Sequence, residues 1–162
     1  MYKVADIDEL LPELQSLVKQ VPAFAVSGFS VFSVDDLAAK TELQALPVVG
    51  VIYDGALPKE PSRNVAIGVA QGSGSVAIVT LQFTVVIAVE YHYAGHDDTK
   101  TQASALLSDL RRTIFGYTGV NTRPWRFVYE RPEPEASGDG LVFYSQVWQT
   151  DIPVIGNTNN PS

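Results

Sequence analysis

The chain has 162 residues, no cysteine and a formal net charge of −7 at pH 7. This length suits a single domain with one core, and the lack of cysteine excludes a disulfide framework, a thiolate metal site and a cysteine nucleophile. The acidic balance argues against a DNA-binding protein, because such proteins gain affinity by neutralising phosphates with Lys and Arg.

The N-terminal segment predicts an amphipathic helix. It has no basic stretch followed by an apolar run, and polar residues interrupt the longest apolar stretches of the chain, so we expect neither a signal peptide nor a membrane span. Asp6 or Asp8 is the expected N-cap, Pro12 should lie near the first turn, and Pro22 should end the helix. The helical spacing is carried by Ile7, Leu10, Leu11, Leu14, Val18 and Val21.

A short helix and a central strand are expected next. Asp35 and Asp36 are candidate caps of a brief helix that runs to Leu46. Residues 48–53 are apolar on both faces, which is typical of a central strand, and the Asp-Gly pair at 54–55 should close it.

Residues 54–75 have the composition of a loop, and residues 72–75 that of a flexible linker. No phosphate-binding loop is expected, because no Gly-Lys-Ser/Thr sequence follows and no helical pattern begins there. We expect residues 72–75 to be mobile in an isolated subunit, since they lack apolar side chains that could offset the entropy of ordering.

A long alternating strand is the most informative feature of the sequence. Over residues 81–93 every odd position is apolar or aromatic, which holds a period of two for thirteen residues. Such a strand reaches about 40 Å, whereas an average strand has about five or six residues. A domain of this size rarely needs that length for its own core, so the strand favours a role in assembly over catalysis.

The sequence predicts where the next helix begins, where it ends and which of its faces is buried. Asp97, Asp98 and Thr99 offer an N-cap, and Gly116 should stop the helix. Its apolar stripe consists of Ala103, Leu106, Leu107, Leu110 and Ile114.

A β-hairpin should close the fold. Residues 125–131 alternate as a strand, and residues 141–152 form the antiparallel partner. The tip at residues 132–140 is too polar and too rich in Pro and Gly to pack, and the chain should fray from Pro153. We therefore expect one domain over residues 1–155 and a disordered tail over 156–162. The hairpin aromatics are expected on its core face and at an interface, rather than stacking on bases or sugars: Trp125, Phe127, Tyr129, Phe143, Tyr144 and Trp148.

Positive charge is concentrated in one short stretch. The first sixty residues hold nine acidic and four basic side chains, whereas five arginines fall within 21 residues near the end of the last helix and the hairpin. A solvated helix end and strand face would explain them, and so would an interface with another subunit. The candidate subunit interface consists of Arg111, Arg112, Arg123, Arg126 and Arg131.

The sequence gives little support to catalysis. His92, His96, Asp97 and Asp98 are the residues with metal-ligand chemistry, but the two histidines span a strand end and a turn, where a spacing of four has no geometric meaning. No serine lies in a Gly-x-Ser-x-Gly pattern. We therefore nominate no catalytic, cofactor-binding or metal site, and expect a protein that is not an enzyme.

Four segments and their order carry a resemblance to a known family. They read ALPVVGVIY at 45–53, VVIAVEY at 85–91, RFVYER at 126–131 and GDGLVFY at 138–144, with a helix before the first segment and another between the second and third. Over residues 5–152 the chain resembles the tail terminator, or tail completion, proteins of long-tailed bacteriophages.

The resemblance implies a small α/β (α+β) domain in which helices pack on a mixed, mostly antiparallel sheet. It further implies that six copies close into a ring on the head-proximal end of the tail tube, where the ring ends tube polymerisation and offers a surface to the connector or neck proteins of the head. DNA would pass through the ring without specific binding. The protein would be a virion component assembled in the host cytoplasm, with no cofactor and no membrane partner.

Two other classes remain open. The chain could be a different ring-forming virion part, such as a neck, head completion or tail-tube protein, and binding to purified tail tubes or to filled heads would separate these. A small metal-dependent hydrolase using His92 and Asp97 is the remote alternative, which bound metal in the purified protein would reveal.

Overall fold

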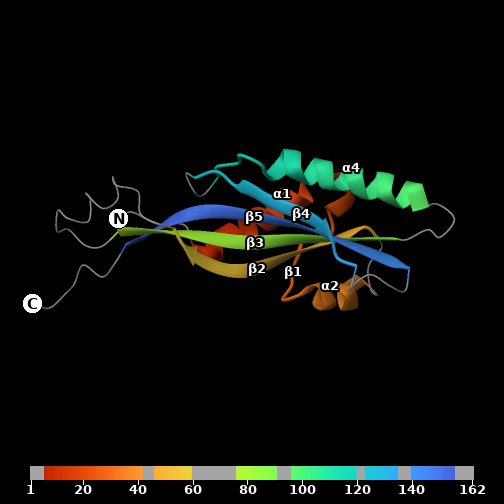
Figure 1. The fold of residues 1–162 in the computed structure, drawn as a ribbon, viewed down its shortest axis with the longest axis horizontal. Helices are drawn as coiled ribbons and strands as arrows, with labels where there is room; N and C mark the ends of the chain where they lie inside the picture. The colour runs from red at the N-terminus through yellow and green to blue at the C-terminus, as the bar shows by residue number, and fades with distance from the viewer. Residues whose placement is uncertain are drawn as a thin grey trace, which may run out of the picture.

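The computed structural model describes residues 6–41, 46–59, 76–90, 96–119, 123–134 and 140–155. For residues 76, 96–101 and 155 it describes the backbone alone. Helices pack on one five-stranded mixed sheet, so the expected single α/β domain with a long strand and a C-terminal hairpin is confirmed (Figure 1). The elements are α1 (Ile7–Lys19), η1 (Pro22–Phe24), β1 (Phe29–Ser30), α2 (Val34–Thr41), β2 (Val48–Pro58), β3 (Val76–Glu90), α4 (His96–Ile114), β4 (Arg126–Pro132) and β5 (Leu141–Ile155).

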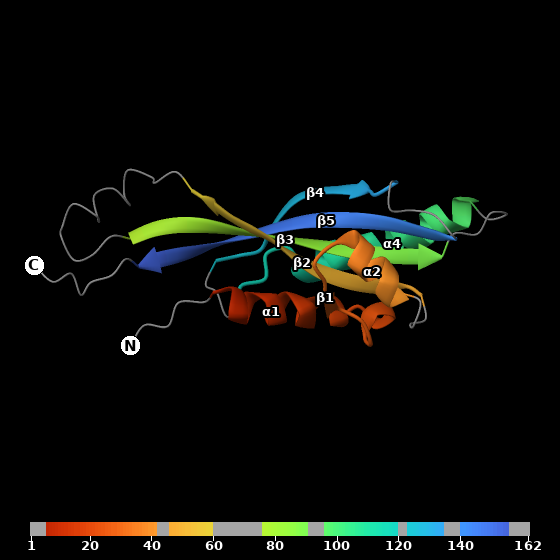
Figure 2. The ribbon, with the colours of Figure 1, turned by 90° about the horizontal axis from the view of Figure 1, so that it is seen from below.

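The strand order is β1-β2-β3-β5-β4. Among the described strands only the β1–β2 pair is parallel, and β3 pairs with β5 along all fifteen residues of both strands. Figure 2 shows β4 along one edge of the sheet, while the ends of β3 and β5 at residues 76 and 155 project beyond the helices. The long strand of the sequence prediction is therefore real, and part of it extends past the body of the domain.

The two faces of the sheet are covered differently. Helices α1 and α4 lie on one side and α2 on the other (Figure 1), and we call these sides the α1/α4 face and the α2 face. The α1/α4 face carries the larger core, in which the odd residues of β3 from Leu81 to Val89 pack against both helices and Trp148. The α2 face carries a small core at one end only, built from Val31, Leu37, Val48, Ile52, Val86, Ala88 and Phe143.

Helix α1 begins as the sequence indicates. Asp6 accepts from the backbone N–H of Ile7, and the side chain of Glu9 accepts from the N–H of Asp6, which forms a capping box. Pro12, however, lies in the helix interior instead of the first turn. Both Pro12 and Asp8 are exposed, so water can solvate the Asp8 carbonyl that loses its helical donor.

Other element ends differ from the prediction. Helix α2 is capped by Ser33, whose Oγ accepts from the Asp36 N–H at 3.1 Å, and it is described over Val34–Thr41. Leu46, the predicted end, is not helical, and residues 42–45 lie outside the described residues. Strand β2 continues past the Asp-Gly pair through a bulge, which Gly55 permits with a φ of +113°. Strand β5 does not fray at Pro153, because pairing with β3 holds it to residue 155.

The start of α4 also lies earlier than expected. The helix is described from His96, so Asp97, Asp98 and Thr99 have helical backbone and lie inside its first turn instead of before it. Gly116, with a φ of +79°, ends it as predicted. Residues 60–75, 91–95, 135–139 and 156–162 lie outside the described residues, so the predictions of a mobile 72–75 stretch and a disordered tail remain predictions. The expected unpacked tip over 132–140 is described only at its ends, where Pro132 pairs with Tyr144 and the Glu133 N–H donates to the Phe143 carbonyl at 2.8 Å.

Candidate assembly interface

The five arginines of the candidate interface do not form one patch. Arg111 and Arg112 lie in the last turn of α4, on the α1/α4 face. Arg126 pairs with Gln149 and Arg131 with Ser145, and these odd residues of β5 share the α2 face with Phe143. Alternation along a strand thus places sequence neighbours on opposite sides of the sheet.

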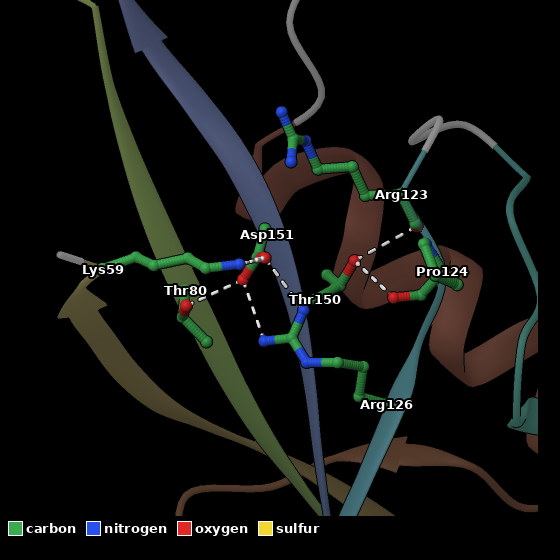
Figure 3. Close-up of polar contacts among 7 residues, drawn as sticks. All are labelled: Lys59, Thr80, Arg123, Pro124, Arg126, Thr150 and Asp151. Carbon is green, nitrogen blue, oxygen red and sulfur yellow. Dashed lines mark hydrogen bonds and ion pairs between the residues drawn. The ribbon is translucent and has the colours of Figure 1, made fainter. Parts of the chain in front are cut away.

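Arg126 belongs to a buried ionic cluster around Asp151, which is only 2 % exposed. The Arg126 guanidinium binds both carboxylate oxygens of Asp151: Nη1 lies 2.9 Å from Oδ2 and Nη2 lies 2.9 Å from Oδ1. This is a bidentate pair. Lys59 Nζ approaches Oδ2 at 2.8 Å, and the Thr80 hydroxyl donates to Oδ1 at 2.7 Å. Figure 3 shows these three donors converging on Asp151, whereas the side chain of Arg123 points away.

The cluster determines the protonation of Asp151. Burial favours the neutral acid and would raise its pKa, but the hydrogen bonds from Arg126, Lys59 and Thr80, together with the Arg126 charge, outweigh burial and hold the pKa of Asp151 well below its usual range. The carboxylate is therefore ionised at any physiological pH, and the cluster joins β4, β5, β3 and the end of β2.

Polar pairs continue along the α2 face beyond this cluster. Gln149 donates to Gln82 at 2.8 Å, and Thr84 bonds to Asp54. Farther along, Glu133 accepts from Arg131 at 2.9 Å and from Ser145 at 2.7 Å. The part of this face that α2 leaves uncovered thus carries polar side chains that bond to one another inside the chain, beside the exposed side chains of Leu57 and Tyr129.

Arg111 and Arg112 border a groove of about 350 Å³ between α4 and β4. Its other lining residues are Phe115, Phe127 and Trp148. The two aromatic rings of Phe127 and Trp148 meet edge to face, with centroids 5.4 Å apart. We call this site the α4/β4 groove; its floor is apolar and its rim carries two guanidinium groups.

Hydrogen bonds hold the floor and rim of the α4/β4 groove in place. Glu130 accepts from Arg111 and also from Gln146 Nε2, the latter at 2.7 Å. Gln146 Nε2 donates to the Leu107 carbonyl at 2.9 Å, and Gln146 Oε1 accepts from Trp148 Nε1 at 3.2 Å. The groove is therefore preformed in the single chain.

The edge strand β4 exposes apolar side chains. Phe127, Val128 and Tyr129 are 37 %, 41 % and 43 % exposed. A bulge between Phe127 and Tyr129 shifts the register, so the two rings lie on opposite faces. Trp125, Phe143 and Trp148 are buried as predicted, whereas the exposed Phe127 and Tyr129 leave the interface part of that expectation a prediction.

The four residues with metal-ligand chemistry lie outside the part of the chain whose side chains are described. His92 lies outside the described residues, as do the side chains of His96, Asp97 and Asp98. Among described residues, no group of three or more His, Cys, Asp or Glu side chains could hold a metal ion. Within the same part of the chain, no helix is long and apolar enough to cross a membrane.

The comparison with protein families identifies the chain as a structural protein of a bacteriophage tail. Residues 7–158 match the family described as phage tail terminator protein, and the chain belongs to that family. The family is structural and is not known for catalysis, and membership makes the protein a component of the virion. No curated protein matches the chain.

Sequence reasoning missed Phe115 as a groove residue. It follows the last residue of α4 and precedes Gly116, so the helical stripe does not include it, and it is 68 % exposed. The sequence does show a phenylalanine next to the glycine that ends the helix. Whether that side chain is exposed, however, depends on how α4 packs against β4.

Proposed function

We propose that this protein caps the head-proximal end of the tail tube as a closed ring, most simply of six copies. The ring ends tube polymerisation and offers a surface on which the connector or neck proteins of the head dock. Family membership supports the tail location, and the observation that carries the ring is the exposed aromatic edge strand β4 beside the preformed α4/β4 groove.

The physical reason is the exposure of apolar surface at a sheet edge. A monomeric protein protects such an edge with charge, with a short strand or with a covering element, since unpaired N–H and C=O groups invite association. Here a bulge interrupts the pairing of β4 with β5, and the apolar side chains of Phe127, Val128 and Tyr129 are still exposed to solvent. A surface of this kind suits a partner copy, and identical copies that join unlike surfaces close into rings.

Arginines contribute to this proposed interface to different degrees. Arg111, Arg126 and Arg131 already pair with acidic groups of the same chain. Arg112 is 79 % exposed, and its contact with Asp109 is long at 3.9 Å. We therefore assign the larger share of any intersubunit pairing to Arg112 and to Arg123, which points away from the Asp151 cluster (Figure 3).

The net charge of −7 supports passage of DNA through the ring. Tight DNA binding comes from cations placed against phosphates, and Lys59 and Arg126, the cations of the α2 face near Asp151, are already held by its carboxylate. DNA would then slide past without sequence-specific contact.

Electron microscopy of tails assembled with and without this protein tests the proposed function. A terminator should leave tails of one length, and tails made without it should overgrow or fail to join heads. Tails of normal length that still join heads without the protein would contradict the proposal. Association of the purified protein with filled heads, and not with tail tubes, would assign it to the neck.

A further inference from the structure

A single aromatic side chain projects from the loop between β1 and α2. Phe32 is 94 % exposed, the highest value among the large apolar side chains of the described residues. A phenylalanine can bury about 150 Å² or more in a core or interface, so leaving it in water forgoes a large stabilisation. Figure 1 shows this loop and α2 on the side of the sheet opposite α4.

The loop around Phe32 is held in one conformation. The N–H of Phe32 donates to Asp36 Oδ2 at 3.1 Å, and the preceding residue, Val31, is buried and donates to the Val51 carbonyl at 3.0 Å. The N–H of Asp36 in turn donates to Ser33 Oγ at 3.1 Å. The ring is thus displayed by a fixed backbone, which lowers the entropy lost when a partner binds it.

The α4/β4 groove has the size and chemistry to receive such a ring. An apolar cavity of about 150 Å³ can hold benzene, and the groove offers about 350 Å³ between Phe115, Phe127 and Trp148. Edge-to-face contact is already the geometry of Phe127 and Trp148. The guanidinium groups at the rim suit the face of an inserted ring as well.

Charge next to Phe32 complements charge next to the groove. Asp35 and Asp36 form the first turn of α2, and Asp35 is exposed. Across a contact, Asp35 would face Arg112, which is 79 % exposed at the rim of the groove. Opposite charges beside an apolar anchor set the orientation of an interface more than its affinity.

We propose that Phe32 of one copy inserts into the α4/β4 groove of the next copy, with Asp35 beside Arg112. The two surfaces lie on opposite faces of one sheet, so they cannot meet within a chain, and each copy offers one of each. Repeating this unlike contact joins copies head to tail, which is the geometry that closes a ring. The inference rests on the proposed ring function and names the surfaces that build it.

The absence of cysteine permits a direct test by engineered crosslinking. We expect the Asp35→Cys, Arg112→Cys double variant, incubated with tail tubes that lack the protein and then with a short bis-maleimide, to give a ladder of covalent multimers. Asp35→Cys alone should give no species above a dimer. Ala77→Cys with Arg112→Cys is the matched control, since Ala77 is exposed near the start of β3, far from α2, and should give no ladder.

Removing the anchor should abolish the ladder. Phe32→Ala or Phe115→Ala, each placed in the Asp35→Cys, Arg112→Cys background, is expected to reduce multimers to the level of the Ala77 control. Both side chains are largely exposed, so the variants should keep the melting temperature of their parent. A ladder that survives both changes, or no ladder from the double-cysteine variant, would overturn the proposal.

Tail length separates this inference from the proposed function. If the double-cysteine variant gives no ladder while tails keep their normal length, the contact is wrong and the capping function stands. If the ladder forms but tails assembled without the protein are normal, the contact stands and the capping function is wrong.

Discussion

Replacing Asp151 by Asn should destabilise the fold, because the ionic cluster joins four strands through one carboxylate. The amide keeps the shape of the side chain but replaces one acceptor oxygen by an NH₂ group. That group would then face Arg126, Lys59 or Thr80, all of which donate to Asp151 in the native protein. A donor would be set against a donor, and two cations would lose their counter-charge.

The expected loss is about 3 kcal/mol in the free energy of unfolding. Removing one partner of a buried ion pair costs about 3–5 kcal/mol. The lower end applies, because the side chains of Lys59 and Arg126 are 48 % and 40 % exposed and water can solvate their charges, while the side chain of Asp151 is buried. For a protein of this length, such a loss lowers the melting temperature by roughly 6–12 °C.

Thermal unfolding at several pH values provides the assay. The pKa of Asp151 is lowered in the folded state, so its charge stabilises the fold above the ordinary aspartate pKa of about 4, and this contribution is lost as pH falls below that value. The difference in melting temperature between wild type and Asp151→Asn should therefore be largest near pH 7 and become smaller towards pH 3.

A matched surface change gives the control for this experiment. Asp109→Asn removes an exposed pair with Arg112 at 3.9 Å, and such pairs contribute about 1 kcal/mol or less. Equal melting temperatures for wild type and Asp151→Asn at pH 7, or a gap that is the same at pH 3, would refute the role given to the cluster.

Three further predictions address the core, the arginines and the histidines. Leu110→Ala empties a fully buried position in the α1/α4 core and should cost about 2–5 kcal/mol; an unchanged melting curve would contradict this packing. Arg112→Glu with Arg123→Glu should impair assembly at tail ends, more strongly at low salt, with no loss of secondary structure by circular dichroism; normal capping would place the interface elsewhere. Ala at both His92 and His96 should leave tail completion intact, and loss of completion in a folded variant would reopen the metal-dependent alternative.

Periodicity in the sequence predicted the long elements well. The odd positions of β3 are buried from residue 81 to 89, and the capping box at Asp6 starts α1 as expected. These features depend on neighbours within a few residues along one element. The bulges in β2 and β4 were not predictable in this way, because a two-residue period gives no sign of where pairing slips.

Contacts between distant residues were beyond sequence reasoning. Lys59 and Asp151 are 92 positions apart and meet only because β2, β3 and β5 lie side by side. Likewise, Phe32 follows a buried valine and precedes a helix, and nothing in its neighbourhood distinguishes a core residue from an exposed one. The arginines were found as a cluster in sequence, but the sheet divides them between its two faces.

The energetics of one Phe32 contact predict that assembly needs the tube end as a template. Fully burying a phenylalanine side chain yields about 1.5–3 kcal/mol, whereas association costs an estimated 4–15 kcal/mol in lost freedom. One Asp35–Arg112 pair at the rim adds about 1 kcal/mol or less. Two free copies would therefore associate weakly.

Copies gathered on a tail tube meet at a high effective concentration, and each then makes two contacts as the ring closes. We expect the purified protein to sediment as a monomer at micromolar concentration and to form the crosslinked ladder only when tail tubes are present. A stable ring in dilute solution without tubes would show that the contact free energy exceeds the cost of association, and would refute this prediction. It would require an interface larger than one aromatic anchor, and β4, with Val128 and Tyr129 exposed at the sheet edge, would be the first place to look.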